Sequence, residues 1–265
     1  MDADRVLARR RAHPVTLQLR GISQRFDGIE ALAPVDLDVR DGEFVCIVGP
    51  SGCGKSTIFN IVSGLLTPTS GSITLDGRDI KGRSGHVGYM LQKDLLLPWR
   101  TVLENIVLGA DITGRASRED RAAAAEMAQR YGLGGYLNHY PHALSGGMRQ
   151  RVAVMRTLAL DHPVMLLDEP FGALDSHTRL LMQQWLLQVW REQRKTIMFV
   201  THDIDEALFL GDRVVVMTPR PGRVQEVIPI DLPRPRDIHM TTDAHYVDLK
   251  ARVLDLIYGR APEVA

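Results

Sequence analysis

The sequence predicts an α/β fold built around a parallel sheet that is covered by helices. Four short apolar runs, which are typical of fully buried strands, carry this prediction: residues 44–48 (FVCIV), 86–91 (HVGYML), 164–168 (VMLLD) and 196–201 (TIMFVT). The opening third alternates apolar with polar residues instead, and the segment between Gln92 and Asp161 shows only helical patterns. We therefore expect an N-terminal antiparallel β subdomain and an α-helical subdomain inserted into the α/β core.

Periodicity places the remaining elements along the chain. Period-two alternation predicts half-buried antiparallel strands at 15–19, 35–39 and 73–75, the last ending in the Asp76-Gly77 turn. Helical patterns follow at 101–109, 117–135, 145–160 and 177–195. Beyond a Pro- and Arg-rich connection at 231–237, which is expected at the surface, an amphipathic pattern predicts a helix at about 244–258 that stops at Gly259.

Composition is that of an ordinary globular chain. Its 265 residues hold 32 Lys+Arg against 32 Asp+Glu and are 45% hydrophobic, so nothing in the charge balance indicates nucleic-acid binding. We find no run of the roughly 18 to 20 apolar residues that a membrane-spanning helix requires, and no apolar signal-peptide segment after the basic cluster at 9–11. The two cysteines, Cys46 and Cys53, are too few for a disulfide framework, which suits a reducing compartment.

A glycine-rich loop between an apolar strand and a predicted helix indicates a phosphate site. Its glycines let backbone N–H groups face a phosphate chain, Lys55 is expected to reach the β and γ phosphates, and the Ser56 hydroxyl is expected to bind Mg²⁺. This context predicts a P-loop NTPase core of the RecA-like type. The residues expected to bind the nucleotide are Gly49, Pro50, Ser51, Gly52, Cys53, Gly54, Lys55, Ser56 and Thr57.

Polar residues at the ends of three other buried strands complete this predicted site. Asp168 is expected to hold Mg²⁺ through water, and Glu169, one residue further out, to polarise an attacking water. His202 is expected to contact the γ-phosphate or that water, and the Gln92 amide to reach both Mg²⁺ and water. Taken singly, these residues also fit structural roles: a capping Asp-Glu pair, a structural histidine and a surface glutamine.

The stretch LSGGMRQR, residues 144–151, predicts a second phosphate site. Ser145 is expected to cap a helix, and Gly146 and Gly147 would let a phosphate approach its N-terminus. The first site belongs to the α/β core and the second to the helical insert, so one nucleotide is not expected to touch both within one chain. A two-fold dimer resolves this, because the second site of one copy would close over ATP held by Lys55 of the other.

Together these motifs resemble those of the ATP-binding cassette (ABC) transporter ATPases. The glycine-rich loop resembles the family's Walker A motif, Gln92 its Q-loop, residues 144–150 its signature, and residues 164–170 its Walker B motif, with Glu169 as catalytic base. The resemblance implies an ABC ATPase domain over 15–230 with its helical subdomain at about 93–160. Residues 1–14 would form an N-terminal tail, and 231–265 a C-terminal linker and amphipathic helix.

The same resemblance implies roles for three further residues. Asp175, in GALD, matches the D-loop, and His202 matches the switch histidine. Phe26 resembles the aromatic residue that stacks on adenine, where the family more often has Tyr. One departure is MRTLAL at 155–160, where related chains usually have small residues at Met155 and Thr157; it affects helix packing and leaves the nucleotide residues unchanged.

Four segments resemble a narrower group, the bacterial importers of nitrate, sulfonates and taurine: LLLPWRTVLENIVLG (95–109), EPFGALD (169–175), MTPRPGRV (217–224) and DLPRPRD (231–237). This resemblance implies a separate ATPase chain at the cytoplasmic face of the inner membrane. Its partners would be integral membrane permease subunits and, indirectly, a periplasmic or lipid-anchored solute-binding protein. The apolar cluster from Leu95 to Trp99 would receive a coupling helix of the permease, although local packing explains it equally well. Nitrate, taurine, alkanesulfonates and a pyrimidine precursor of thiamine all fit as cargo.

Three other classes of function fit less well. Chromosome-repair scaffolds need a long coiled coil between the two phosphate sites, and translation-associated ones usually carry two cassettes per chain. A GTP switch would need an Asn-Lys-x-Asp motif, which none of Asn60, Asn105 and Asn138 begins. An inactive binding module is disfavoured because the P-loop lysine, both carboxylates and the histidine are all in place.

Overall fold

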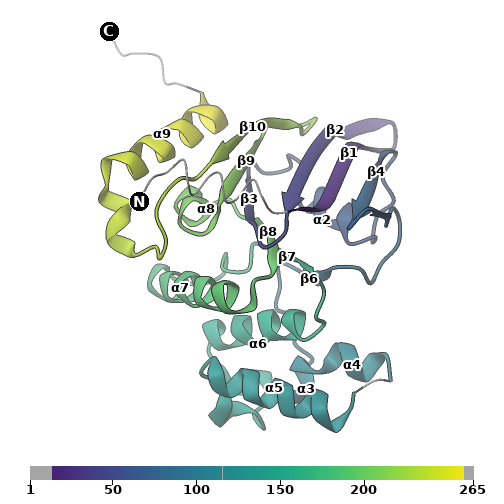
Figure 1. The fold of residues 1–265 in the computed structure, drawn as a ribbon, viewed down its shortest axis with the longest axis vertical. Helices are drawn as coiled ribbons and strands as arrows, with labels where there is room; N and C mark the ends of the chain where they lie inside the picture. Colours follow the sequence, from purple (N-terminus) through teal and green to yellow (C-terminus); the bar gives the residue numbers. More distant parts are fainter. Residues whose placement is uncertain (1–13, 115, 260–265) are drawn as a thin grey trace.

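The computed structural model describes residues 14–114 and 116–259, which form two sheets (Figure 1). One sheet is antiparallel and runs in the order β2-β1-β4-β5: β2 Ile29–Arg40, β1 Val15–Phe26, β4 Ser70–Leu75 and β5 Arg78–Asp79. The second sheet runs in the order β10-β9-β3-β8-β7-β6: β10 Val224–Pro229, β9 Arg213–Met217, β3 Phe44–Val48, β8 Thr196–Val200, β7 Val164–Asp168 and β6 Gly88–Met90. Its strands are parallel except for β10, which pairs antiparallel with β9 at the edge.

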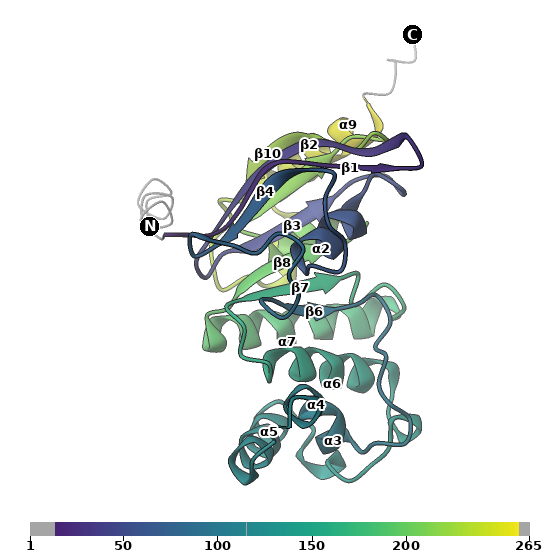
Figure 2. The same ribbon diagram turned by 90° about the vertical axis from the view of Figure 1, so that its right-hand side faces the viewer.

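Helices cover the parallel sheet and build a separate layer beyond it (Figure 2). The α-helices are α2 Lys55–Val62, α3 Val102–Ile106, α4 Leu108–Ile112, α5 Arg118–Arg130, α6 Gly146–Leu158, α7 Ser176–Gln193, α8 Ile204–Leu210 and α9 Ala244–Tyr258. Helices α3 to α6 lie between β6 and β7 in the chain, and in both views α3 and α5 lie at the end of the molecule opposite the antiparallel sheet. Within the described residues, no helix combines the length and hydropathy needed to cross a membrane.

Strand β3 shows why its run is apolar throughout. Phe44, Cys46 and Val48 pack into a core shared with α6, α7 and α8, whereas Val45 and Ile47 pack into a second core shared with α2 and the antiparallel sheet. All five side chains have zero exposure. A strand with both faces covered loses the polar half of the period-two pattern, which is the signal the sequence carries.

The predicted α/β fold, with its antiparallel subdomain and helical insert, is confirmed. Strands β9 and β10 were not predicted, and Cys53, which was predicted to bind the nucleotide, is fully buried within the glycine-rich loop. The tail expected over residues 1–14 lies, apart from residue 14, outside the described residues, as does the end of the chain from residue 260.

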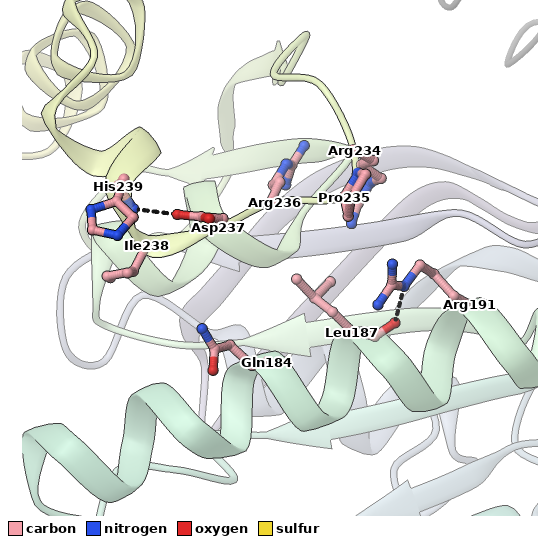
Figure 3. A pocket seen from close by; sticks show the side chains of 9 residues that line it. All are labelled: Gln184, Leu187, Arg191, Arg234, Pro235, Arg236, Asp237, Ile238 and His239. Carbon is pink, nitrogen blue, oxygen red and sulfur yellow. Dashed lines mark hydrogen bonds between the residues drawn. The ribbon is translucent and has the colours of Figure 1, made fainter.

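The C-terminal segment is packed against the core rather than lying loosely on the surface. Arg236 is 7% exposed, and its Nη1 donates to the carbonyls of Leu208, Phe209 and Gly211 at the end of α8. Arg234 pairs with Asp212 at 2.9 Å. Figure 3 shows the 234–239 segment passing over α7, where it encloses a pocket of about 250 Å³. The expectation of a surface connection at 231–237 is therefore wrong for Arg236, because its guanidinium caps the buried end of a helix.

Replacing Glu206 with Gln should reduce the pH dependence of stability. Glu206 is 3% exposed, and burial raises its pKa from 4.5 to about 7 although Thr201 and Gln183 hydrogen-bond the carboxylate. A raised carboxyl pKa destabilises the fold increasingly from pH 4.5 to 7, because the unfolded chain ionises first, and the full cost persists above pH 7. Glu206→Gln should therefore be roughly 1–3 kcal/mol more stable than wild type at pH 8, melting a few degrees higher, with little difference at pH 5.

Thermal unfolding at pH 5 and pH 8 measures this difference, with the exposed Glu126→Gln as the matched control. Equal shifts in melting temperature at both pH values would contradict the assignment of the cost to the Glu206 carboxylate.

Candidate functional site

A cavity of about 640 Å³ opens where the parallel sheet meets the antiparallel one. Its lining comes from the glycine-rich loop, the ends of three parallel strands, the β1–β2 hairpin and the loop between β9 and β10. The lining residues are Phe26, Ala31, Ser51, Gly52, Gly54, Lys55, Ser56, Thr57, Gln92, Glu169, His202 and Arg220. The sequence predicted most of this set, from segments far apart in the chain, and the structure brings them to one cavity.

The glycine-rich loop is shaped by left-handed backbone at its C-terminal end. Gly54, which caps α2, has a φ of 97°, and a Cβ there would lie 3.2 Å from Leu32 Cδ1. Lys55 is 8% exposed, and its Nζ donates to the carbonyls of Gly49 at 2.8 Å and Pro50 at 3.1 Å. Gly49, Pro50 and Cys53, all predicted to bind the nucleotide, do not line the cavity; they form the turn that holds Lys55.

Asp168, at the end of β7, is buried beside this loop with 5% exposure. Burial raises its pKa, while hydrogen bonds from Ser56 and Tyr89 and the charge of Lys55 act in the opposite direction. Tyr89 Oη lies 3.3 Å from both Asp168 Oδ2 and Asn60 Oδ1. Burial also raises the pKa of Tyr89, so its hydroxyl stays protonated and can donate to the carboxylate.

Glu169 follows β7, and its side chain is contacted by residues that follow the two neighbouring strands, β6 and β8. Its φ of 45° is unusual for a residue with a side chain, and its N–H donates to the Val200 carbonyl at 2.9 Å. Gln92 Nε2 donates to Glu169 Oε2 at 3.2 Å, and His202 Nδ1 lies 3.3 Å from the same oxygen. One carboxylate oxygen is thus held from the strands on either side, and Glu169 is also one of the residues that line the cavity.

The residues predicted to hold Mg²⁺ offer a hydroxyl, an amide carbonyl and a carboxylate, from Ser56, Gln92 and Asp168. Hard oxygen donors of this kind are those that Mg²⁺ prefers, usually one or two carboxylates with phosphate oxygens and water. A buried carboxylate with a raised pKa gains most from an adjacent cation, because the cation stabilises its ionised form. The donor set therefore fits the predicted metal.

The second predicted phosphate site lies on other elements. Ser145 Oγ accepts from Met148 N at 3.3 Å and caps α6. Gly147 is close to α7, since a Cβ there would lie 3.0 Å from Thr178 Cγ2, and Asp175 caps that helix by accepting from Thr178 N. Ser145, Gly146, Gly147 and Asp175 are all absent from the lining of the first cavity, so two helix N-termini form a cluster of their own.

Sequence reasoning missed three residues of the site. Tyr89 lies in a run that was interpreted only as an apolar strand, although its hydroxyl reaches Asp168. Arg220 and Gly222 belong to the loop between β9 and β10. Arg220 contacts the Glu30 carbonyl, although the two residues are 190 positions apart in the sequence. Gly222 is packed so closely on the glycine-rich loop that a Cβ there would lie 1.7 Å from the Cys53 carbonyl oxygen. The Pro-Gly dipeptide was the only local signal of this approach.

Known proteins match this chain along most of its length. A family model described as ABC transporter matches residues 32–172. An uncharacterized ABC transporter ATP-binding protein of Methanocaldococcus jannaschii is 41% identical over 261 residues, which is 97% of each chain. The taurine import ATP-binding protein TauB of Yersinia pestis is 44% identical over 210 residues, covering 79% of this chain and 82% of that protein.

A solved dimeric bacterial ABC transporter cassette has the same fold. It superposes with a TM-score of 0.70 at 34% identity, covering 81% of this chain and 98% of its own. The same cassette in a dimeric post-hydrolysis state bound to ADP and phosphate superposes with a TM-score of 0.67 at 33% identity, over the same shares of the two chains.

Replacing Gly222 with Ala should displace the glycine-rich loop, although Gly222 itself lies on the loop between β9 and β10. The added Cβ would overlap the Cys53 carbonyl at 1.7 Å, so the loop that carries Lys55 must shift. Overpacking of this kind usually costs about 1–3 kcal/mol, and we expect MgATP affinity to fall on the order of ten-fold or more. The dissociation constant and the melting temperature are measured together, against Gly135→Ala, where nothing lies within 4 Å of the added Cβ. Wild-type affinity in Gly222→Ala would show that the loop tolerates the overlap.

Proposed function

This chain belongs to the ABC transporter family, and from that premise we propose that it is the ATP-hydrolysing subunit of an importer for a small sulfonate or related anion. The observation that carries the proposal is the convergence of Gln92 and His202 on Glu169 Oε2, at 3.2 and 3.3 Å, in a cavity that also contains the P-loop lysine. ATP and Mg²⁺ are the ligands of such ATPases, and hydrolysis drives transport.

The side chains divide the work of hydrolysis. Lys55 would exchange its bonds to loop carbonyls for bonds to phosphate oxygens, and the exposed Phe26 would stack on the base. Ser56, Gln92 and Asp168 would hold Mg²⁺, which when bound neutralises charge on the phosphates. Glu169 would accept the proton of the attacking water, because Gln92 and His202 fix one oxygen and leave the carboxylate facing the cavity.

The second cluster supports a head-to-tail dimer as the working form. Ser145, Gly146 and Gly147 lie at the start of α6, where the N–H groups have no partner within the helix, yet none of the three lines the cavity of their own chain. A second copy related by a two-fold axis would bring this helix N-terminus over the phosphates held by the first. The dimeric cassette of similar fold supports the arrangement.

The loop after Gln92 supports contact with a membrane permease. Leu95 is 50% exposed and Trp99 71% exposed, whereas Leu96 is buried, so local packing does not account for the whole cluster. The loop is nevertheless firmly anchored, since Arg156 donates to the carbonyls of Asp94 and Leu95. An anchored loop with apolar side chains facing outward suits a permease helix. On this proposal the chain is a peripheral protein at the cytoplasmic face of the membrane.

For cargo, the taurine relative favours sulfonates over the other solutes of the group. Selectivity itself would reside in the permease and in a solute-binding protein, which also belong to the proposal. Nitrate and a thiamine pyrimidine precursor are the alternatives, and growth on nitrate separates the first of these from sulfonates.

Glu169→Gln should bind MgATP but hydrolyse it about 10²- to 10⁴-fold more slowly, because the amide cannot accept the proton of water. The variant should accumulate as a closed dimer, measured by gel filtration with MgATP alongside phosphate release. Glu126→Gln, on the exposed face of α5, is the matched control and should behave as wild type. A Glu169→Gln protein that stays monomeric with MgATP would contradict the sandwich dimer.

Lys55→Ala in the source organism should abolish growth on the cargo when it is the only source of sulfur or nitrogen. The buried ammonium contacts the phosphate loop, so its loss removes ATP use without removing the permease. Growth is measured on taurine, alkanesulfonates and nitrate, with Lys81→Ala, whose side chain bonds the Gly71 carbonyl outside the cavity, as control. Failure to grow on sulfonates alone supports the proposal. Failure on nitrate alone would identify nitrate as the cargo instead, and unimpaired growth on all sources would contradict the proposal.

A further inference from the structure

The nucleotide cavity has a second cationic side chain whose role no motif assigns. Arg220 lies on the loop between β9 and β10, at residues 218–223, and lines the cavity together with Lys55. Lys55 is buried and bonded to carbonyls of its own loop, whereas Arg220 is exposed. The two cations therefore differ in how far their side chains are committed to contacts within the protein.

Backbone contacts hold the loop against β2, close to Phe26, the residue proposed to stack on adenine. Gly222 N donates to the Ala31 carbonyl at 3.1 Å, and Ala33 N donates to the Gly222 carbonyl at 2.9 Å. Arg220 Nε reaches the Glu30 carbonyl at 3.5 Å. Glu30 and Ala31 belong to β2, next to the β1–β2 turn at which Phe26 pairs with Ile29. Arg220 is thus anchored to the hairpin that carries Phe26, whereas Gln92 and His202 contact Glu169 at the ends of the parallel strands.

The bonding pattern leaves the flat end of the guanidinium available. Among residues 14–114 and 116–259, the Glu30 carbonyl is the one hydrogen-bond partner recorded for Arg220, and it occupies Nε at the limit of hydrogen-bond length. A guanidinium is planar and always charged, so it can stack on an aromatic base and donate to ring nitrogens or ribose hydroxyls. Phe26, 43% exposed in the same cavity, offers an aromatic face for the same base.

We infer that Arg220 is a nucleotide-binding residue that contacts the adenosine end of ATP together with Phe26. The inference rests on the proposed nucleotide site and adds the Arg220 side chain to it. Arg220 is 190 positions from Glu30 in the sequence, although the two residues are in contact. Because ATP and ADP share adenosine, the contact contributes equally to the binding of both. It contributes nothing to the binding of a phosphate chain that lacks the base.

The test measures equilibrium binding of MgADP, of a non-hydrolysable MgATP analogue and of inorganic tripolyphosphate with Mg²⁺. Arg220→Ala should weaken both nucleotides alike, by about three- to thirty-fold, and leave tripolyphosphate unchanged. Arg220→Lys should fall between, since an ammonium keeps the charge but loses the planar stacking surface. Arg223→Ala is the matched control, because Arg223 is on the same loop but does not line the cavity.

Three results would overturn the inference. Unchanged nucleotide affinity in Arg220→Ala with a lower melting temperature would reduce Arg220 to a support for its loop. Weaker binding of the ATP analogue and tripolyphosphate with unchanged MgADP binding would place the guanidinium at the γ-phosphate instead. A wild-type chain that binds neither nucleotide would remove the proposed site itself, an outcome distinct from the failure of Arg220 alone.

Discussion

The parallel register of β6, β7 and β8 is the constraint on which the site depends. Asp168 pairs with Val200, and Met90 pairs with Leu167, so the three strands end at nearly the same height. The residues that follow them therefore emerge at one edge of the sheet, where ligands of open α/β folds collect. A shift of one strand by a single residue would turn its side chains to the opposite face and separate the two partners of Glu169.

Electrostatics then differentiates two adjacent carboxylates. Asp168 is buried, surrounded by the donors Ser56 and Tyr89, and placed where a cation stabilises its charge. Glu169 has left the strand through a left-handed residue, and its carboxylate is oriented by an amide and an imidazole rather than by a fixed cation. Neighbouring acids in different surroundings can take different parts in one reaction, which suits the proposed roles of Asp168 as metal ligand and Glu169 as base.

The sequence was most informative where a physical requirement is local. A strand buried on both faces must be apolar, a tight phosphate loop needs glycine, and a helix start favours Ser or Asp, so β3, Gly54 and Ser145 could be predicted. The parts that were missed depend on tertiary contacts. Strand β10 is an edge strand with mixed burial, and the Arg220 loop reaches the cavity through contacts with β2, which no local pattern reports.

A continuous set of contacts within one chain links the two regions that are proposed to bind phosphate. Gln92 holds Glu169 in the first site and begins the loop whose Asp94 and Leu95 carbonyls accept from Arg156. Arg156 is near the C-terminal end of α6, and Ser145 caps the other end of that helix. The 13 residues of α6 are joined by hydrogen bonds from N–H groups to the carbonyls four residues earlier, so its two ends are connected by one regular element. In the proposed dimer, a change at Gln92 would therefore reach the N-terminus that is proposed to close the partner's site, and it would do so through the same loop that is proposed to contact the permease.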